Sequence, residues 1–134
     1  MGRIFLLWLV LAVLGWGGAA GVEHWRLTQA PHRLAVVLDS SFPMAADWDR
    51  AQAVVHQLDH ARYTVYAAFT EKGLVHSWSS ELNFARVTPY APRDTQRLGK
   101  LALVSELAKA ERIIYVTSDP APAVPAGWEV VTEQ

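Results

Sequence analysis

The N-terminal stretch limits what this chain can fold into more than any other part of its sequence. Residues 4–22 carry no charged side chain, with Arg3 before them and Glu23 after them. As a helix, a stretch of that length spans roughly 28 Å, close to the ~30 Å hydrocarbon core of a bilayer. A helix that packs on a soluble core normally has a polar face, and this stretch has none. We therefore expect residues 1–22 to form a transmembrane helix that crosses the membrane with residues 4–22.

Two interpretations of this segment stay open. It is an uncleaved signal anchor, or it is a signal peptide that is cleaved after the small residues Gly18-Ala19-Ala20. We favour the anchor. Arg3 and the terminal amine favour a cytoplasmic N-terminus. The expected location is therefore the inner (cell) membrane, crossed once, with the rest of the chain on the exported, periplasmic side.

The remainder of the chain is expected to form one domain. Residues 23–32 are polar, end near Pro31 and suggest a connector, which leaves residues 33–134 for a compact domain with its own core. The formal net charge of −1 and the scattered basic residues argue against a nucleic-acid partner. The chain has no cysteine, which excludes disulfides, thiol catalysis and cysteine-based zinc sites.

Strand and helix patterns alternate along residues 33–134. Continuous apolar, β-branched runs are typical of strands buried on both faces, whereas apolar residues at helical spacing indicate amphipathic helices. The pattern predicts an α/β fold, with a mainly parallel sheet, one antiparallel hairpin and flanking helices. The expected elements are a strand at 34–38, a helix at 48–58, a hairpin of strands at 63–69 and 74–78, a helix at 95–108, a strand at 112–117 and a short strand at 128–131.

Similar polar residues follow the two buried strands. Asp39-Ser40-Ser41 comes after the first and Thr117-Ser118-Asp119 after the second. Ligands of open α/β sheets bind beyond the carboxyl ends of strands, and hard oxygen ligands suit Mg²⁺, Mn²⁺ or Ca²⁺. Thr95, at the head of the second predicted helix, could reach the same edge. The alternative interpretation is that these residues have only turn and helix-capping roles, which such residues commonly have.

These features together resemble a von Willebrand factor type A (integrin I-like) domain. The resemblance rests on the Asp39-Ser40-Ser41 loop after an apolar strand, the order of elements that follows, and the final strand before Asp119. It implies a truncated domain with a degenerate metal-ion-dependent adhesion site, in which Asp39, Ser41, Thr95 and Asp119 would be the metal ligands. Pro43 and Ser118 depart from the family pattern, which has a serine and an acidic residue there.

The favoured function is a membrane-anchored module that binds a membrane-associated protein partner, with a divalent metal at the edge of the sheet. The alternative is a metal-independent structural accessory subunit of a membrane protein complex, whose small residues in the apolar segment permit close helix packing. A small hydrolase is a third hypothesis. Ser41, His76 and Asp119 could form a triad, but no catalytic motif surrounds them, and we do not expect an enzyme.

Overall fold

The computed structural model describes residues 2–132, which divide into two compact units at the boundary between Pro31 and His32. The first unit is a single helix, α1 (Gly2–Gln29), with no buried residue. It is long and apolar enough to cross a membrane. The helix continues through most of the expected connector, because neither proline nor glycine interrupts the chain between Val22 and Pro31.

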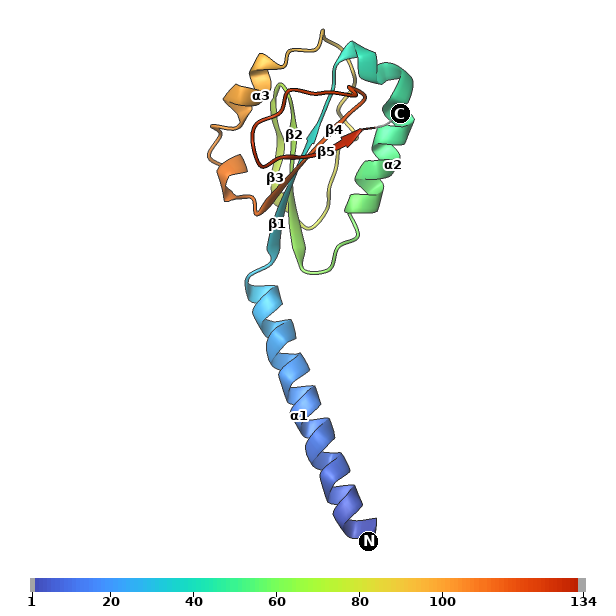
Figure 1. Cartoon of the computed structure of the whole chain (residues 1–134), viewed down its shortest axis with the longest axis vertical. Helices are drawn as coiled ribbons and strands as arrows, with labels where there is room; N and C mark the ends of the chain where they lie inside the picture. The colour runs from blue at the N-terminus through green and yellow to red at the C-terminus, as the bar shows by residue number, and fades with distance from the viewer. Residues whose placement is uncertain (1, 133–134) are drawn as a thin grey trace. The chain divides into compact units, whose positions relative to one another are not determined.

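The second unit is built on a five-stranded mixed sheet in the order β3-β2-β1-β4-β5 (Figure 1). β1 pairs in parallel with β2 and β4, β4 pairs in parallel with β5, and β3 is antiparallel to β2. The predicted α/β class, with a mainly parallel sheet and one hairpin, is confirmed. The strands are β1 (His32–Leu38), β2 (Thr64–Thr70), β3 (Gly73–Ser79), β4 (Arg112–Thr117) and β5 (Glu129–Thr132).

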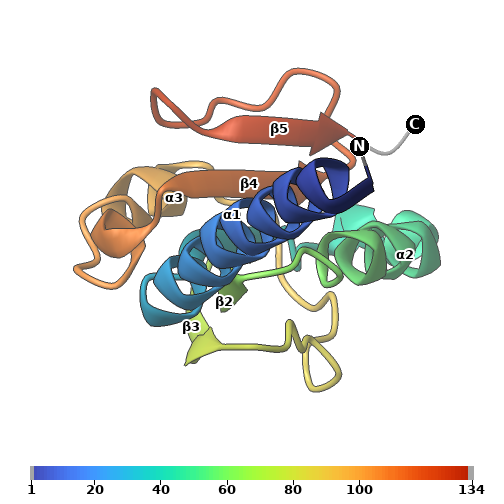
Figure 2. The same cartoon turned by 90° about the horizontal axis from the view of Figure 1, so that it is seen from below.

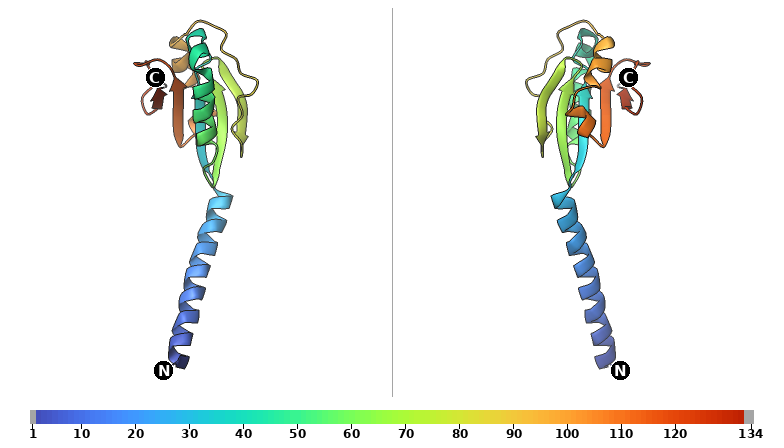
Figure 3. Two further views of the ribbon diagram at one scale, coloured as in Figure 1. Left: turned by 90° about the vertical axis from the view of Figure 1, so that its right-hand side faces the viewer. Right: turned by 90° about the vertical axis from the view of Figure 1, so that its left-hand side faces the viewer.

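Helices cover both faces of this sheet. α2 (Trp48–Leu58) follows a 3-10 turn, η1 (Phe42–Asp47), and packs on the face that carries Val36 and Leu38. α3 (Gln96–Leu101) packs on the other face, which carries Ala35 and Val37. Successive side chains of β1 point to opposite faces of the sheet and therefore pack into two separate cores. Figure 2 shows the two helices on opposite sides of the strands, and each panel of Figure 3 has one of them in front.

The second predicted helix is shorter than expected. α3 ends at Leu101, and a separate 3-10 turn, η2 (Leu107–Lys109), follows it. Leu98, Leu101 and Leu107 are all buried in the same core. In one continuous helix, Leu98 and Leu107 would lie about 180° apart around the axis, because each residue turns the chain by roughly 100°. The helix must break so that both leucines can reach the sheet.

A long irregular segment joins β3 to α3. Leu82 and Phe84 anchor its first half in the core. Its second half runs beside the loop after β1, where the amide of Tyr90 donates to the carbonyl of Ser40 (3.0 Å) and the amide of Phe42 donates to the carbonyl of Ala91 (2.8 Å). These backbone bonds hold the end of the segment at the carboxyl edge of the sheet.

Candidate functional site

The carboxyl ends of β1 and β4 meet where the strand order changes direction. Leu38 pairs with Val116 in the parallel ladder, and the amide of Asp39 donates to the carbonyl of Val116 (2.9 Å). The two strand ends therefore lie side by side, which the hypothesis of a shared site requires. In doubly wound sheets this switch point forms a crevice that commonly holds the ligand. We call the residues around it the rim: 39–42, 71–72, 90–93 and 117–119.

Asp39 lies at the centre of the rim with a fully buried side chain. Its Oδ1 accepts from the amide of Ser41 (3.0 Å), and its Oδ2 accepts from the hydroxyl of Thr117 (2.8 Å). The guanidinium of Arg93 completes this shell, with Nε and a terminal nitrogen each 3.0 Å from Oδ2. A buried carboxylate needs such partners because burial without them is costly.

Arg93 also reaches the residues that follow β4. One terminal nitrogen donates to the hydroxyl of Ser118 (3.1 Å), and the other lies 3.5 Å from a carboxylate oxygen of Asp119. A single cation from the long β3–α3 segment therefore links the loops after β1 and β4. We call this group of Arg93, Asp39, Ser118 and Asp119 the Arg93 clasp.

A second buried carboxylate lies beside the clasp, in the two-residue turn between β2 and β3. Glu71 accepts from both the amide (2.8 Å) and the hydroxyl (3.0 Å) of Ser40 and pairs with the ammonium of Lys72 at 3.0 Å. The same ammonium donates to the carbonyl (2.9 Å) and hydroxyl oxygen (2.7 Å) of Ser40 and sits 3.7 Å from the centre of the Tyr90 ring. Gly73 closes the turn with a φ of 145°, which glycine adopts readily.

The structure brings three of the four predicted metal ligands to the rim. Asp39 and Asp119 are joined through Arg93, and Ser41 is buried next to Asp39. The hydroxyl of Ser41 has no hydrogen-bond partner. Thr95 is exposed at the start of α3 and makes no capping bond with its side chain. Asp94 accepts the amide of Gln96 (3.1 Å) there instead.

The rim as it stands does not fit a divalent ion. Arg93 places its positive charge against the two carboxylates that would bind the metal, so an ion could bind only after this guanidinium moved away. Within residues 2–132, no group of three or more His, Cys, Asp or Glu side chains could hold a metal. Magnesium, manganese or calcium binding stays a prediction, and only the unpartnered hydroxyl of Ser41 favours it.

The triad considered from the sequence is not assembled. The Nδ1 atom of His76 lies 2.8 Å from the carbonyl of Ser77, and its Nε2 atom accepts the amide of Asn83 (3.1 Å), so both ring nitrogens are used within β3 and its following segment. The ammonium of Lys72 is close enough to Ser40 for a Ser–Lys pair. Ser40 is buried, however, and the same ammonium is ion-paired with Glu71 and donates to the Ser40 carbonyl, so its contacts are those of a structural ion pair.

Burial also changes the acid–base chemistry behind the rim. It raises the pKa of the Tyr115 phenol well above its ordinary value, and the nearby negative charge of Asp39 raises it further. Tyr115 therefore stays neutral and packs edge-on against Trp128.

Sequence reasoning did not find Arg93, Glu71 or Lys72 as residues of this site. The sequence places Glu71-Lys72-Gly73 between the two strands of the predicted hairpin, but nothing local indicates that the carboxylate of Glu71 is buried against the loop after β1. Arg93 lies in an irregular segment, 54 residues from its partner Asp39. The only available signal was that these three residues are charged and lie in segments predicted to be irregular or a turn.

The fold and site define an α/β domain with helices on both faces of its sheet and an ion-paired rim at the switch point of the strand order. In comparisons with known proteins, no family model, no curated protein and no solved structure matches the chain.

Proposed function

We propose that this protein is a membrane-tethered accessory module, similar to a von Willebrand factor type A domain, which binds a protein partner through the rim. Binding does not need a metal, because Arg93 supplies the cation. The rim then acts as a preformed protein surface, and α1 keeps it at the membrane. The partner is membrane-associated, and the body lies on the exported side.

The observation that carries this proposal is the Arg93 clasp. It pairs one guanidinium with two rim carboxylates, those of Asp39 and Asp119, and ties two loops of the sheet to the long β3–α3 segment. A surface held in this way is organised before its partner arrives, which lowers the entropic cost of binding.

Exposed aromatic side chains support a protein partner. Phe42 and Tyr90 are each 60% exposed, and the backbones of their segments are hydrogen-bonded beside the clasp. Aromatic residues are enriched at the centres of protein interfaces, where a few of them contribute most of the binding energy.

Affinity measurements with the full chain in detergent test this proposal. A partner captured from the source membranes is identified by mass spectrometry, purified and titrated against wild type and variants. We expect Phe42→Ala and Tyr90→Ala to weaken binding at least tenfold, as truncated interface anchors do. Leu103→Ala is the matched control, because Leu103 is also an exposed apolar residue (85%) but lies after α3. Equal effects of all three changes would exclude the rim as the binding surface.

The same titration separates the metal-free and metal-bridged versions. We expect the affinity to be unchanged when EDTA replaces millimolar Mg²⁺. Loss of binding in EDTA and its recovery with Mg²⁺ or Mn²⁺ would instead establish the metal-bridged module.

A divalent site at the rim is the second candidate, and the buried hydroxyl of Ser41 favours it. This version predicts a rise in melting temperature with Mg²⁺ or Mn²⁺, because a ligand that binds only the folded state stabilises it. Ser41→Ala should abolish the rise. In the metal-free version, the same change leaves stability the same or slightly higher, since it removes a buried polar group that has no partner.

A further inference from the structure

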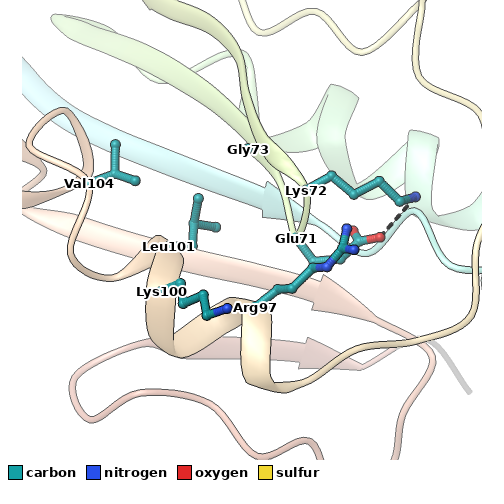
Figure 4. A pocket seen from close by; sticks show the side chains of 7 residues that line it. All are labelled: Glu71, Lys72, Gly73, Arg97, Lys100, Leu101 and Val104. Atoms are coloured by element: carbon teal, nitrogen blue, oxygen red, sulfur yellow. Dashed lines mark ion pairs between the residues drawn. The ribbon is translucent and has the colours of Figure 1, made fainter.

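A separate pocket lies between the β2–β3 turn and α3. It encloses about 300 Å³ and is lined by Glu71, Lys72, Gly73, Arg97, Lys100, Leu101 and Val104 (Figure 4). Glu71, Lys72 and Arg97 lie toward one end of it and Val104 toward the other, with Lys100 and Leu101 between them. The pocket therefore has a polar end and an apolar end, as sites for small organic molecules commonly do.

The polar end carries an excess of positive charge. Lys72 is neutralised by Glu71, whose carboxylate is also bonded to Ser40. Among residues 2–132, Arg97 forms an ion pair with Asp94 alone. The two side chains of that pair are 52% and 44% exposed, so solvent weakens the attraction. Lys100 has no carboxylate at ion-pair distance within residues 2–132.

Glu71 does not cancel this charge. Its carboxylate oxygens already accept from Ser40 and Lys72, and its side chain is only 3% exposed. An anion in the pocket would therefore contact Arg97 and Lys100 in the more exposed part of the site. Lys72 offsets the negative charge of the buried Glu71. Guanidinium and ammonium groups bind carboxylates and phosphates through charge-assisted hydrogen bonds.

We propose that this pocket binds a small organic anion, a carboxylate or a phosphate monoester, on a short apolar stem. Arg97 and Lys100 bind the anionic group, and Leu101 and Val104 contact the stem. The pocket shares Glu71 and Lys72 with the rim, but the residues that bind the anion, Arg97 and Lys100, lie outside it, so the two proposals are tested by different variants.

Isothermal titration calorimetry of the full chain in detergent tests this assignment. The ionic strength is held constant, and chloride serves as the reference anion. The probes are acetate, isovalerate, inorganic phosphate and isobutyl phosphate. We expect saturable binding of at least one stemmed probe, tighter than that of its stemless counterpart. If acetate and isovalerate bind more tightly than the two phosphates, the ligand is a carboxylate. The opposite order identifies a phosphate monoester. Absence of saturable binding for all four probes overturns the proposal.

Charge-removing variants locate the site. We expect Lys100→Gln and Arg97→Gln each to weaken binding of the preferred probe about tenfold, the effect of losing one charge-assisted hydrogen bond. Lys109→Gln is the matched control, because Lys109 is a half-exposed lysine paired with Glu106 outside the pocket. A loss in Lys109→Gln as large as in Lys100→Gln would show general attraction to surface charge and overturn the proposal.

Discussion

Two arginine–carboxylate pairs at different places on the sheet show how much the surroundings of an ion pair matter. Arg112 and Glu129 join the amino ends of β4 and β5 through two parallel bonds of 2.8 and 2.7 Å. Arg93 and Asp39 join two segments at the carboxyl edge through longer contacts of 3.0 Å. The Arg112–Glu129 side chains are 61% and 50% exposed, whereas those of Arg93 and Asp39 are 23% and 0% exposed.

Geometry alone would rank the Arg112–Glu129 pair as the stronger. Exposed pairs contribute little, because water screens the attraction and holding both side chains costs entropy. In a buried pair, the loss of one partner leaves a charge without compensation. We therefore expect the protein to depend on the Arg93 clasp far more than on the Arg112–Glu129 pair.

The largest expected effect comes from breaking the clasp. Arg93→Met should lower the free energy of unfolding by about 3–5 kcal/mol, because Asp39 would stay buried without its counter-ion. Denaturant unfolding of the full chain in detergent, followed by circular dichroism, measures this loss.

The double variant Asp39→Asn/Arg93→Met is the control for charge. It removes the acid along with its partner, so it should recover a large part of the stability that Arg93→Met loses. A double variant as unstable as Arg93→Met would show that packing of the arginine side chain, and not its charge, holds the rim.

A smaller loss is expected at the neighbouring turn. Lys72→Met should lower the free energy of unfolding by roughly 2 kcal/mol, about the value of a hydrogen bond to a charged group. Glu71 would keep both bonds from Ser40, so its charge stays partly compensated. The same unfolding experiment measures this loss. A loss greater than that of Arg93→Met would show that the protein depends more on the ion pair of Glu71 than on that of Asp39.

The free energy of unfolding should fall at alkaline pH because the phenol of Tyr115 is buried behind the clasp. The pKa of Tyr115 is raised in the folded protein, so its contribution to stability is complete below its unfolded pKa of about 10 and is lost as the pH rises above that value. The expected slope is about 1.4 kcal/mol per pH unit for one such group.

Tyr115→Phe should flatten this alkaline loss in melting experiments across the pH range. Burial also raises the pKa of Tyr66, so Tyr66→Phe should remove a further part of the loss. An unchanged slope in Tyr115→Phe would mean that the phenol is hydrated in solution.

The smallest effect is expected at the exposed pair. Arg112→Gln should change the free energy of unfolding by only ~0.2–1 kcal/mol, the range of exposed ion pairs. The hydrogen bonds and charge of Arg112 lower the pKa of Glu129. The small contribution of the pair is therefore present above the ordinary carboxyl pKa and disappears as the pH falls through the lowered one.

An NMR titration of the Glu129 carboxyl checks the local effect. Its pKa should rise toward the ordinary value in Arg112→Gln, even though stability hardly changes. If Arg112→Gln destabilised the protein as much as Arg93→Met, the contrast between buried and exposed pairs would not hold.

The sequence by itself determined the elements whose signals are local. The uncharged run of residues 4–22 specifies an apolar helix, and the run 34–38 specifies a buried strand. Because the carboxyl ends of parallel strands share one edge, the sequence also indicated that Asp39 and Asp119 would lie at the same end of the sheet.

Only the tertiary structure decided what those carboxylates contact. Arg93 reaches Asp39 across 54 residues, and Glu71 becomes buried because the β2–β3 turn lies against Ser40. The break after Leu101 likewise depends on the shape of the core that receives Leu107. Periodicity records which face of one element is apolar, whereas the partner of a loop side chain depends on how distant segments pack together.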